Sequence, residues 1–180
     1  MACLDVAGRR CVVVGGGLVG LEKAAGLVTC GAKVTVISPD LHAAFSELEV
    51  EWVARPYRRS DLEGAFLVIA ATSDTAVNQT VHADAEARNM LCNVADVPEL
   101  CNFILPAVHR EGPIAIAVST GGASPALAKR LRSQIAELVG PEHADLAEEL
   151  RALRPEVKER FETYEERRDY FEDLVTERLS

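Results

Sequence analysis

The sequence predicts an α/β fold, a doubly wound parallel sheet followed by helices, and three observations lead to this class. Over roughly residues 1–112, short apolar and β-branched runs alternate with segments of helical apolar spacing, which is typical of parallel strands joined by crossover helices. Beyond residue 141 the chain is rich in charged, helix-favouring residues and has no strand pattern. Of its 180 residues, 48% are hydrophobic, which is enough apolar content to bury a core.

The first part of this pattern is a strand, a glycine-rich loop, a helix and a second strand. Val12–Val14 is a β-branched run, and apolar residues between positions 18 and 28 recur at the spacing of one helix face. Gly31 stands where a helix C-cap glycine is expected, and the next apolar run, residues 33–38, ends at Pro39. This βαβ unit is the context that a dinucleotide-binding loop requires.

The glycine-rich loop has the spacing G-x-G-x-x-G at Gly15, Gly17 and Gly20. In this fingerprint the first glycine makes the turn, the second lets the backbone reach the pyrophosphate, and the third lets the helix approach the strand. The alternative is a tight turn without a ligand, but the βαβ context favours a Rossmann-type nucleotide-binding domain. Asp40, twenty residues after Gly20, is the acid suitably spaced for the ribose. No arginine lies beside Asp40, which favours NAD over NADP.

The alternation of strands and helices continues after this unit. Three further strands and one helix are predicted, at residues 50–57, 66–72 and 90–96 and at residues 75–88. Thr72 stands at the end of the second of these strands, so we expect it at the same sheet edge as the glycine loop, in contact with the cofactor. In the alternative interpretation, Ser73 or Asp74 only caps the helix that follows, and the two roles are compatible.

The chain changes character after Gly112 and Pro113. One more strand is predicted at residues 114–120, followed by a glycine turn and a helix with Ser124 as N-cap and Pro125 at its first position. In the charged segment after residue 141, apolar residues recur at intervals. We therefore expect that segment to pack by one face on the rest of the chain or on a second subunit.

Composition excludes several classes of partner. The formal net charge of −9 argues against binding to nucleic acid or to an anionic membrane. No apolar run approaches the roughly 20 residues that span a bilayer, and Met1–Arg10 lacks the apolar stretch of a signal peptide, so we expect a cytoplasmic protein. Five cysteines without a CxxC pair predict reduced, mostly buried thiols. The four histidines have no metal-ligand spacing, so no metal site is expected.

Four segments of the chain together carry a family resemblance: "VVVGGGLVGLEKAAGLVTCGAKVTVISPDL", "LVIAATSDTAVNQTV", "CNVADVPELCNFILPAV" and "IAVSTGGASPALAKRLR". They resemble the precorrin-2 dehydrogenase family, which also occurs as the amino-terminal part of multifunctional sirohaem synthase. The resemblance implies NAD-dependent oxidation of precorrin-2 to sirohydrochlorin by a homodimer. It also implies a nucleotide-binding domain at residues 1–112, a small dimerisation region at 113–140 and a C-terminal helical domain at 141–180.

The resemblance further indicates the site residues. Asp96, in "NVADVPE", matches the residue with the main catalytic role in the family, and the end of a parallel strand suits a carboxylate that accepts a proton. In the alternative, Asp96 only caps the turn that follows. The residues expected to contact NAD, from the fingerprint and the resemblance together, are Gly15, Gly17, Leu18, Val19, Gly20, Pro39, Asp40 and Thr72. The residues expected to bind the substrate carboxylates, through glycine amides, hydroxyls and a helix start, are Ser119, Thr120, Gly121, Gly122 and Ser124.

Two other functions stay open at this point. Some members of the family are bifunctional dehydrogenases and ferrochelatases, and a regulatory Rossmann domain would sense NAD without turnover. His109 is expected near the substrate cleft, although a lone histidine is more often structural or solvated. For Lys129, Arg130 and Arg132, added charge for the substrate and a solvated helix face are equally compatible with the sequence.

Overall fold

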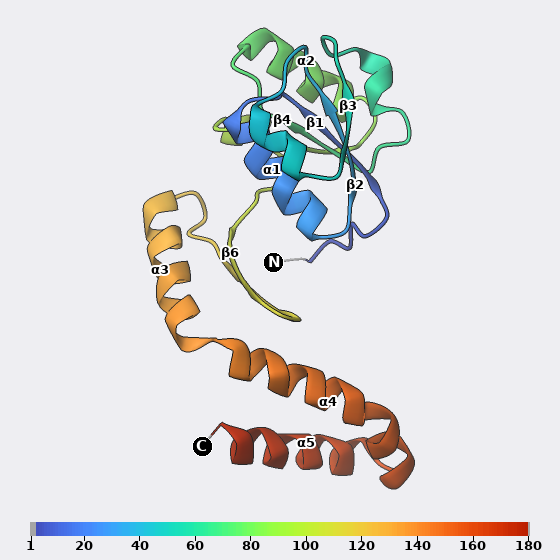
Figure 1. Cartoon of the computed structure of the whole chain (residues 1–180), viewed down its shortest axis with the longest axis vertical. Helices are drawn as coiled ribbons and strands as arrows, with labels where there is room; N and C mark the ends of the chain where they lie inside the picture. The colour runs from blue at the N-terminus through green and yellow to red at the C-terminus, as the bar shows by residue number, and fades with distance from the viewer. Residues whose placement is uncertain (1–2, 180) are drawn as a thin grey trace. The chain divides into compact units, whose positions relative to one another are not determined.

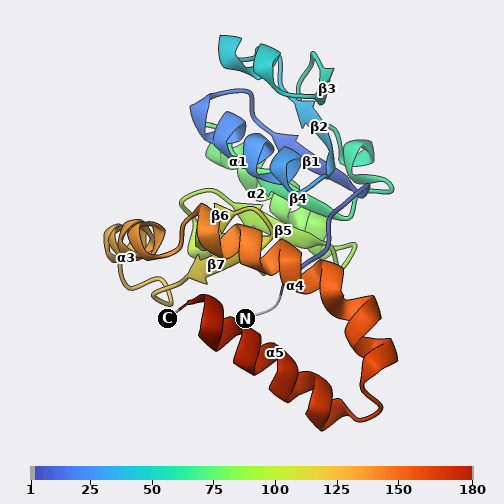
Figure 2. The same cartoon turned by 60° about the horizontal axis from the view of Figure 1, so that its bottom comes forward.

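The computed structural model describes residues 3–179, and the chain divides after Ile104 into two compact units. Within residues 3–104, five strands form one parallel sheet in the order β3-β2-β1-β4-β5 (Figures 1 and 2). The strands are β1 (Arg10–Val14), β2 (Lys33–Ile37), β3 (Val50–Val53), β4 (Leu67–Ala70) and β5 (Leu91–Val94). The strand order reverses between β1 and β4, and such a switch point is where open α/β sheets bind ligands, outside the carboxyl ends of the strands.

Helices cover both faces of this sheet, as Figure 2 shows. One face packs residues such as Val13 and Val36 against α1 (Leu18–Thr29), and the other packs Val14 and Val68 against residues of α2 (Thr75–Glu86). Alternate residues of β1, β2 and β4 are therefore buried on opposite faces, which explains why these strands are almost continuous apolar runs. The edge strand β3 is only half-buried. The predicted doubly wound parallel sheet is confirmed.

Three short 3₁₀ helices complete the first unit, and they explain where a predicted strand is wrong. They are η1 (Ala43–Glu47), η2 (Arg59–Leu62) and η3 (Pro98–Leu100). The strand predicted at residues 50–57 ends at Val53, because the backbone turns at Arg55 and the Arg55 side chain binds Asp61 of η2. Pro56 also cannot donate a ladder hydrogen bond.

All five cysteines are present as thiols, and two of them, Cys11 and Cys92, are fully buried in the sheet. Burial raises the pKa of the Cys11 thiol to about 11 and that of Cys92 to about 12. Both thiols are therefore protonated and unreactive at neutral pH. Cys3 is exposed, whereas Cys30 and Cys101 are half-buried.

The second unit is a hairpin of strands followed by three helices. Its described elements are β6 (Ala107–Glu111), β7 (Ile114–Val118), α3 (Pro125–Leu138), α4 (Pro141–Arg160) and α5 (Tyr164–Arg178). Strand β7 was predicted, but β6 was not, and the two pair antiparallel in a sheet of their own. Residue 112, the expected end of the nucleotide-binding domain, is the glycine of the turn between them, with φ +53°.

Helix signals in this unit are seen where the sequence predicts them. Ser124 caps α3 by accepting a hydrogen bond from the amide of Leu127 (3.2 Å), and Pro125 follows at the first helical position. The segment after residue 141 is helical but interrupted, because Thr163 and Glu166 form a capping box that starts α5. No helix among residues 3–179 is both long and apolar enough to cross a membrane.

Acid is expected to weaken the first unit through Asp61. Arg55 donates to both carboxylate oxygens of Asp61 (2.6 and 2.8 Å), and the amide of Arg58 donates to one of them (2.8 Å). The hydrogen bond from Arg55 lowers the pKa of Asp61 below its ordinary value. A lowered folded-state pKa adds stability above the ordinary value of about 3.9, and this stability is lost as the pH falls through the folded-state value.

Asp61→Asn is therefore expected to lower the Tm at pH 7 by about 5 °C, with a difference from the wild type that shrinks below about pH 4. Thermal melts followed by circular dichroism measure this effect. Glu63→Gln removes an exposed carboxylate two residues away and is expected to leave the Tm unchanged. A Tm difference for Asp61→Asn that persists undiminished to about pH 2 contradicts the role given to the ion pair.

Candidate functional site

The loops that follow four strands of the sheet are joined side by side at its carboxyl edge. Each loop begins with a residue that still bonds to the neighbouring strand. These bonds run from Gly15 N to Ile37 O (3.0 Å), Ser38 N to Val53 O (3.3 Å), Ala71 N to Val14 O (2.8 Å) and Ala95 N to Ala70 O (2.9 Å). The edge is therefore a continuous row in which the glycine loop, the Pro39–Asp40 loop, the Thr72 loop and the Asp96 turn are neighbours.

The three fingerprint glycines have different reasons to be glycine. A Cβ atom at Gly15, where φ is +123°, would overlap the carbonyl oxygen of Ala71, and one at Gly20 would overlap the carbonyl oxygen of Gly15. A Cβ atom at Gly17 would have no protein atom within 4 Å. Packing thus requires the first and third glycines, whereas at Gly17 the space is open, as a ligand approaching the backbone needs.

The N-terminus of α1 faces this open space without a cap from the protein. Gly17 is its N-cap, no side chain bonds the first amides, and the first turn contains no acidic residue. An uncapped helix N-terminus carries unpaired amides and a partial positive charge, which suits a pyrophosphate. Leu18 is 67% exposed and Val19 41%, so both predicted contact residues present apolar side chains at the surface of the edge.

The loop after β2 lies against the glycine loop. The amide of His42 donates to the carbonyl oxygen of Gly16 (2.7 Å), and a Cβ atom at Gly16 would overlap the carbonyl oxygen of Asp40. Pro39 and Asp40 are exposed, so both are accessible to a ligand at this edge. Trp52, the single tryptophan of the chain, donates from Nε1 to the carbonyl oxygen of Ser38 (2.9 Å). Its fluorescence is therefore a natural reporter of this loop.

The loop after β4 is held by a buried asparagine that the sequence analysis did not single out. Asn78 of α2 accepts from the amide of Thr72 (3.3 Å) and from its hydroxyl (2.8 Å), and donates to its carbonyl oxygen (3.0 Å). Asp74 caps α2 through the amides of Ala76 and Val77, so the capping alternative is confirmed. Asn78 lies three residues before buried Val81, and a polar residue on the apolar face of a helix is the signal that could have revealed it.

Asn78→Ala is expected to weaken NADH binding about 10-fold, because the released Thr72 loop no longer fixes one wall of the site. Titration of Trp52 fluorescence with NADH measures the Kd. Gln79→Ala, an exposed substitution on the same helix, is the matched control and is expected to leave the Kd unchanged. Equal Kd values for Asn78→Ala and the wild type would show that the cofactor does not depend on this loop.

The turn after β5 presents Asp96 in a left-handed backbone conformation. Val97 N bonds to Val94 O (3.2 Å), which closes a four-residue turn, and Asp96 has φ +61° and an exposed side chain. Few residues other than glycine adopt this conformation, although aspartate and asparagine tolerate it best. Strained backbone of this kind concentrates at functional sites.

The glycine turn before α3 belongs to the second unit. Its three hydroxyl groups, on Ser119, Thr120 and Ser124, differ in whether they still have a proton to donate. Thr120 Oγ1 both accepts from Ser124 N and donates to Ser124 O, each at 3.1 Å, so its capacity is used within the turn. Ser119 and Ser124 only accept, from the amides of Gly121 and Leu127, and each keeps a hydroxyl proton to donate. Gly121 and Gly122 have φ values of +61° and +85°.

The second unit also contains His109 and three basic residues whose roles the sequence leaves open. His109 Nε2 lies 2.8 Å from the carbonyl oxygen of Val139 and so donates to the segment between α3 and α4. Lys129, Arg130 and Arg132 are all exposed on α3. Among residues 3–179, His, Cys, Asp and Glu side chains form no cluster of three or more suited to a metal ion.

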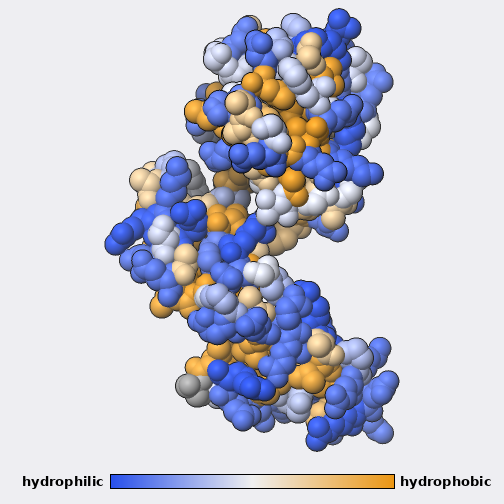
Figure 3. Space-filling model, in the orientation of Figure 1, coloured by the Kyte–Doolittle hydropathy of each residue, from blue (hydrophilic) through white to orange (hydrophobic). Residues whose placement is uncertain are grey.

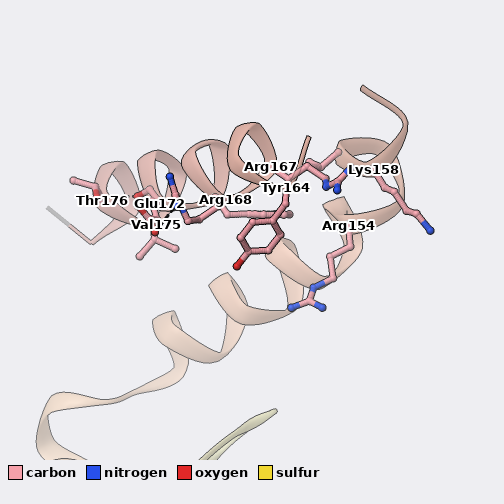
Figure 4. A pocket seen from close by; sticks show the side chains of 10 residues that line it. Arg154, Lys158, Tyr164, Arg167, Arg168, Glu172, Val175 and Thr176 are labelled. Atoms are coloured by element: carbon pink, nitrogen blue, oxygen red, sulfur yellow. Dashed lines mark hydrogen bonds and ion pairs between the residues drawn. The ribbon is translucent and has the colours of Figure 1, made fainter. Parts of the chain in front are cut away.

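An open groove of about 790 Å³ lies between helices α4 and α5 (Figure 4), and the sequence did not predict it. Its basic side chains are Arg154, Lys158, Arg167 and Arg168, of which Arg168 is paired with Asp169 at 2.6 Å. None of the predicted site residues lines this groove.

The structure thus brings the predicted cofactor residues and Asp96 to one edge of one sheet. The predicted substrate residues Ser119–Ser124 lie together in the other unit, on one turn. Sequence reasoning gave no site role to Gly16, Trp52 or Asn78. Gly16 and Trp52 contact the loop after β2 from other parts of the chain, whereas Asn78 bonds Thr72, six residues before it.

Three sequence families match consecutive parts of the chain. A putative NAD(P)-binding family matches residues 2–107, the central region of sirohaem biosynthesis proteins matches 111–138, and the sirohaem synthase dimerisation region matches 142–180. The region with the dimerisation match is therefore the helical segment, whereas the sequence analysis placed dimerisation at 113–140.

Curated relatives and a solved structure match the same span. The siroheme synthase of Methylobacillus flagellatus is 42% identical over 92% of this chain, and that of Citrobacter koseri is 39% identical over 96%. The chain spans only 36% and 39% of the length of these two relatives. The solved structure of SirC, a precorrin-2 dehydrogenase, has a TM-score of 0.81 and 27% identity, with 100% of this chain and 92% of SirC covered. With its NAD(P)-binding sheet, central region and dimerisation region in this order, the chain belongs to the precorrin-2 dehydrogenase family.

Proposed function

We propose that this chain oxidises precorrin-2 to sirohydrochlorin with NAD as the electron acceptor, and that it works as a homodimer. The observation that carries the proposal is the position of the Asp96 turn on the same sheet edge as the open face of Gly17. An exposed carboxylate on this edge supports an oxidation, because a domain that only binds the nucleotide does not need one. The match to SirC supports the choice of substrate.

The chain's residues suit binding of NAD. The amides at the start of α1 bind the pyrophosphate, and the Asp40 carboxylate accepts from the ribose hydroxyls. Because no arginine lies beside Asp40, a 2′-phosphate would face an unneutralised carboxylate, which favours NAD over NADP. Thr72, fixed by Asn78, forms the opposite wall.

The reaction removes a hydride and a proton from precorrin-2. Bound NAD supplies the acceptor for the hydride. The Asp96 carboxylate accepts the proton that the substrate loses, so that precorrin-2 and NAD give sirohydrochlorin, NADH and one proton. The exposed position of Asp96 then lets the proton pass to water.

Precorrin-2 carries several carboxylates, and the acidic chain needs local groups to bind them. The Ser119–Ser124 turn supplies these groups in our proposal. Ser119 and Ser124 each retain a hydroxyl proton to donate, and Gly121 and Gly122 expose the backbone around them. Thr120 serves the turn itself, because its hydroxyl is already used twice.

Two features of the second unit support a homodimer. The dimerisation region matches residues 142–180. In addition, α3 exposes Leu127, Leu131 and Leu138, which are 50%, 38% and 72% accessible and are spaced four and seven residues apart, on one helix face. Figure 3 shows apolar surface on this unit. Exposed leucines along one helix face favour burial against a second copy.

An anaerobic assay tests the proposal directly. Purified protein is supplied with precorrin-2 and NAD, and NADH formation and tetrapyrrole absorbance are followed together with the mass in solution by light scattering. We expect stoichiometric NADH and sirohydrochlorin and the mass of a dimer. NADH binding without turnover would instead support an NAD-sensing domain, and metal insertion into sirohydrochlorin without NAD would add a chelatase activity.

A further inference from the structure

The turn that presents Asp96 is bonded to one thiol, that of Cys101. Cys101 Sγ accepts from the amide of Val94 (3.2 Å) and lies within donating distance of two carbonyl oxygens, those of Val94 (3.2 Å) and Val97 (3.3 Å). The side-chain amide of Asn93 also donates to it (3.5 Å). The single S–H can point to either carbonyl while the sulfur accepts from the amides.

These contacts fix both ends of the turn. Val94 and Val97 are its first and last residues, and Asp96 stands between them. No other side chain in the described part of this loop is shown bonding to both ends. The thiol therefore limits how far the turn can open.

Helix η3 reverses the chain direction and so brings Cys101 next to the turn. Leu100 N bonds to Val97 O (3.0 Å) and Cys101 N to Pro98 O (3.1 Å), so that the chain doubles back below the turn. The next residue, Asn102, is bonded back to β5. Cys92 N donates to the side-chain oxygen of Asn102 (2.8 Å), and the backbone amide of Asn102 donates to Cys92 O (3.0 Å). The loop from β5 to Asn102 is thus closed, with the sulfur inside.

Such a support stabilises the turn, because Asp96 has φ +61°, a conformation that costs free energy in a residue with a Cβ atom even though aspartate tolerates it better than most. A sulfur atom reaches further than a hydroxyl oxygen and is a weaker donor and acceptor. The sulfur contacts three backbone groups, Val94 N, Val94 O and Val97 O, at 3.2–3.3 Å.

We infer that Cys101 is a positioning residue for Asp96. The Cys101 thiol holds both ends of the turn, so that the Asp96 carboxylate keeps its orientation toward the reacting carbon of the substrate. This inference rests on the catalytic role proposed for Asp96. Cys101 itself touches neither substrate nor cofactor in this assignment, and acts only through the turn.

The test compares two cysteines on the same segment in the full-length chain. Cys101→Ala removes the support, whereas Cys92→Ala removes a fully buried thiol that packs in the apolar cluster of β5. Cys101→Ser restores a donor and acceptor at the site. Three quantities are measured for each variant: kcat and KM for precorrin-2 oxidation, the Kd for NADH from Trp52 fluorescence, and the hydrogen exchange rate of the Val94 amide.

We expect Cys101→Ala to lower kcat about 10-fold or more, since small displacements of a reacting group have effects of this order, with the Kd for NADH unchanged. Exchange of the Val94 amide is expected to accelerate, and Cys101→Ser to recover much of kcat. Cys92→Ala is expected to lower the Tm and to keep kcat.

Each other outcome overturns a distinct claim. A wild-type kcat for Cys101→Ala, or a loss equal to that of Cys92→Ala, removes the positioning role while the proposed function stands. Unchanged Val94 exchange in Cys101→Ala shows that the thiol does not hold the turn. An inactive wild-type chain removes the proposed function, and this inference fails with it.

Discussion

Replacing Asp96 with asparagine is expected to lower kcat for precorrin-2 oxidation by about 10²–10⁴-fold, the usual contribution of a positioned general base. Asparagine tolerates the left-handed backbone of the turn (φ +61°) about as well as aspartate does, so the substitution removes the charge and keeps the loop. Alanine at this position would combine loss of the carboxylate with backbone strain. Asp96→Asn is therefore the cleaner test, with initial rates of NADH formation as the measurement.

A matched control lies three residues along the same loop. Glu99→Gln removes one exposed carboxylate from η3 and leaves the turn intact, so its kcat is expected to equal that of the wild type. Both variants should bind NADH with an unchanged Kd, because neither residue belongs to the cofactor set. A kcat for Asp96→Asn similar to that of Glu99→Gln would assign proton transfer to another group.

The sheet was predictable because its physical requirements are local. Strands β1, β2 and β4 are buried on both faces, so the runs around Val12, Val34 and Val68 are mostly apolar and end at recognisable breakers. The glycine loop, the Gly31 C-cap and the Ser124 N-cap are equally local, because one or two residues determine the backbone there. The order of the cofactor loops along one edge then follows from parallel pairing.

Features that depend on contacts across the chain were not predictable in the same way. Strand β6 is only half-buried and has the sequence AVHRE, which lacks a strong apolar period, so its pairing with β7 had no clear signal. Asn78 and Cys101 lie only four to seven residues from the groups they bond, but apolar periodicity does not indicate which polar side chain bonds which loop. The identity of the substrate came from sequence resemblance, because the geometry of a nucleotide edge is shared by many reactions.

Gly17→Ala is expected to weaken NADH binding about 100-fold. The effect is expected on ligand binding and not on folding. A Cβ atom at Gly17 would meet no protein atom within 4 Å, so the folded chain accommodates it, with a loss of at most about 1 kcal/mol in helix capping. The added methyl group instead occupies the space through which a pyrophosphate would approach the amides of α1. A Kd from Trp52 fluorescence and a Tm from thermal melts measure the two effects separately.

Gly26→Ala on the same helix is the control, because its Cβ atom also meets nothing within 4 Å and it lies away from the edge. An alanine inside a helix is expected to add about 0.5–1 kcal/mol of stability without changing the Kd. If Gly17→Ala bound NADH as tightly as Gly26→Ala, the pyrophosphate would have to lie elsewhere on the sheet edge. If the Gly17→Ala variant unfolded instead, the glycine would be required by the turn itself. All three fingerprint glycines would then be explained by folding, and none would indicate a bound dinucleotide.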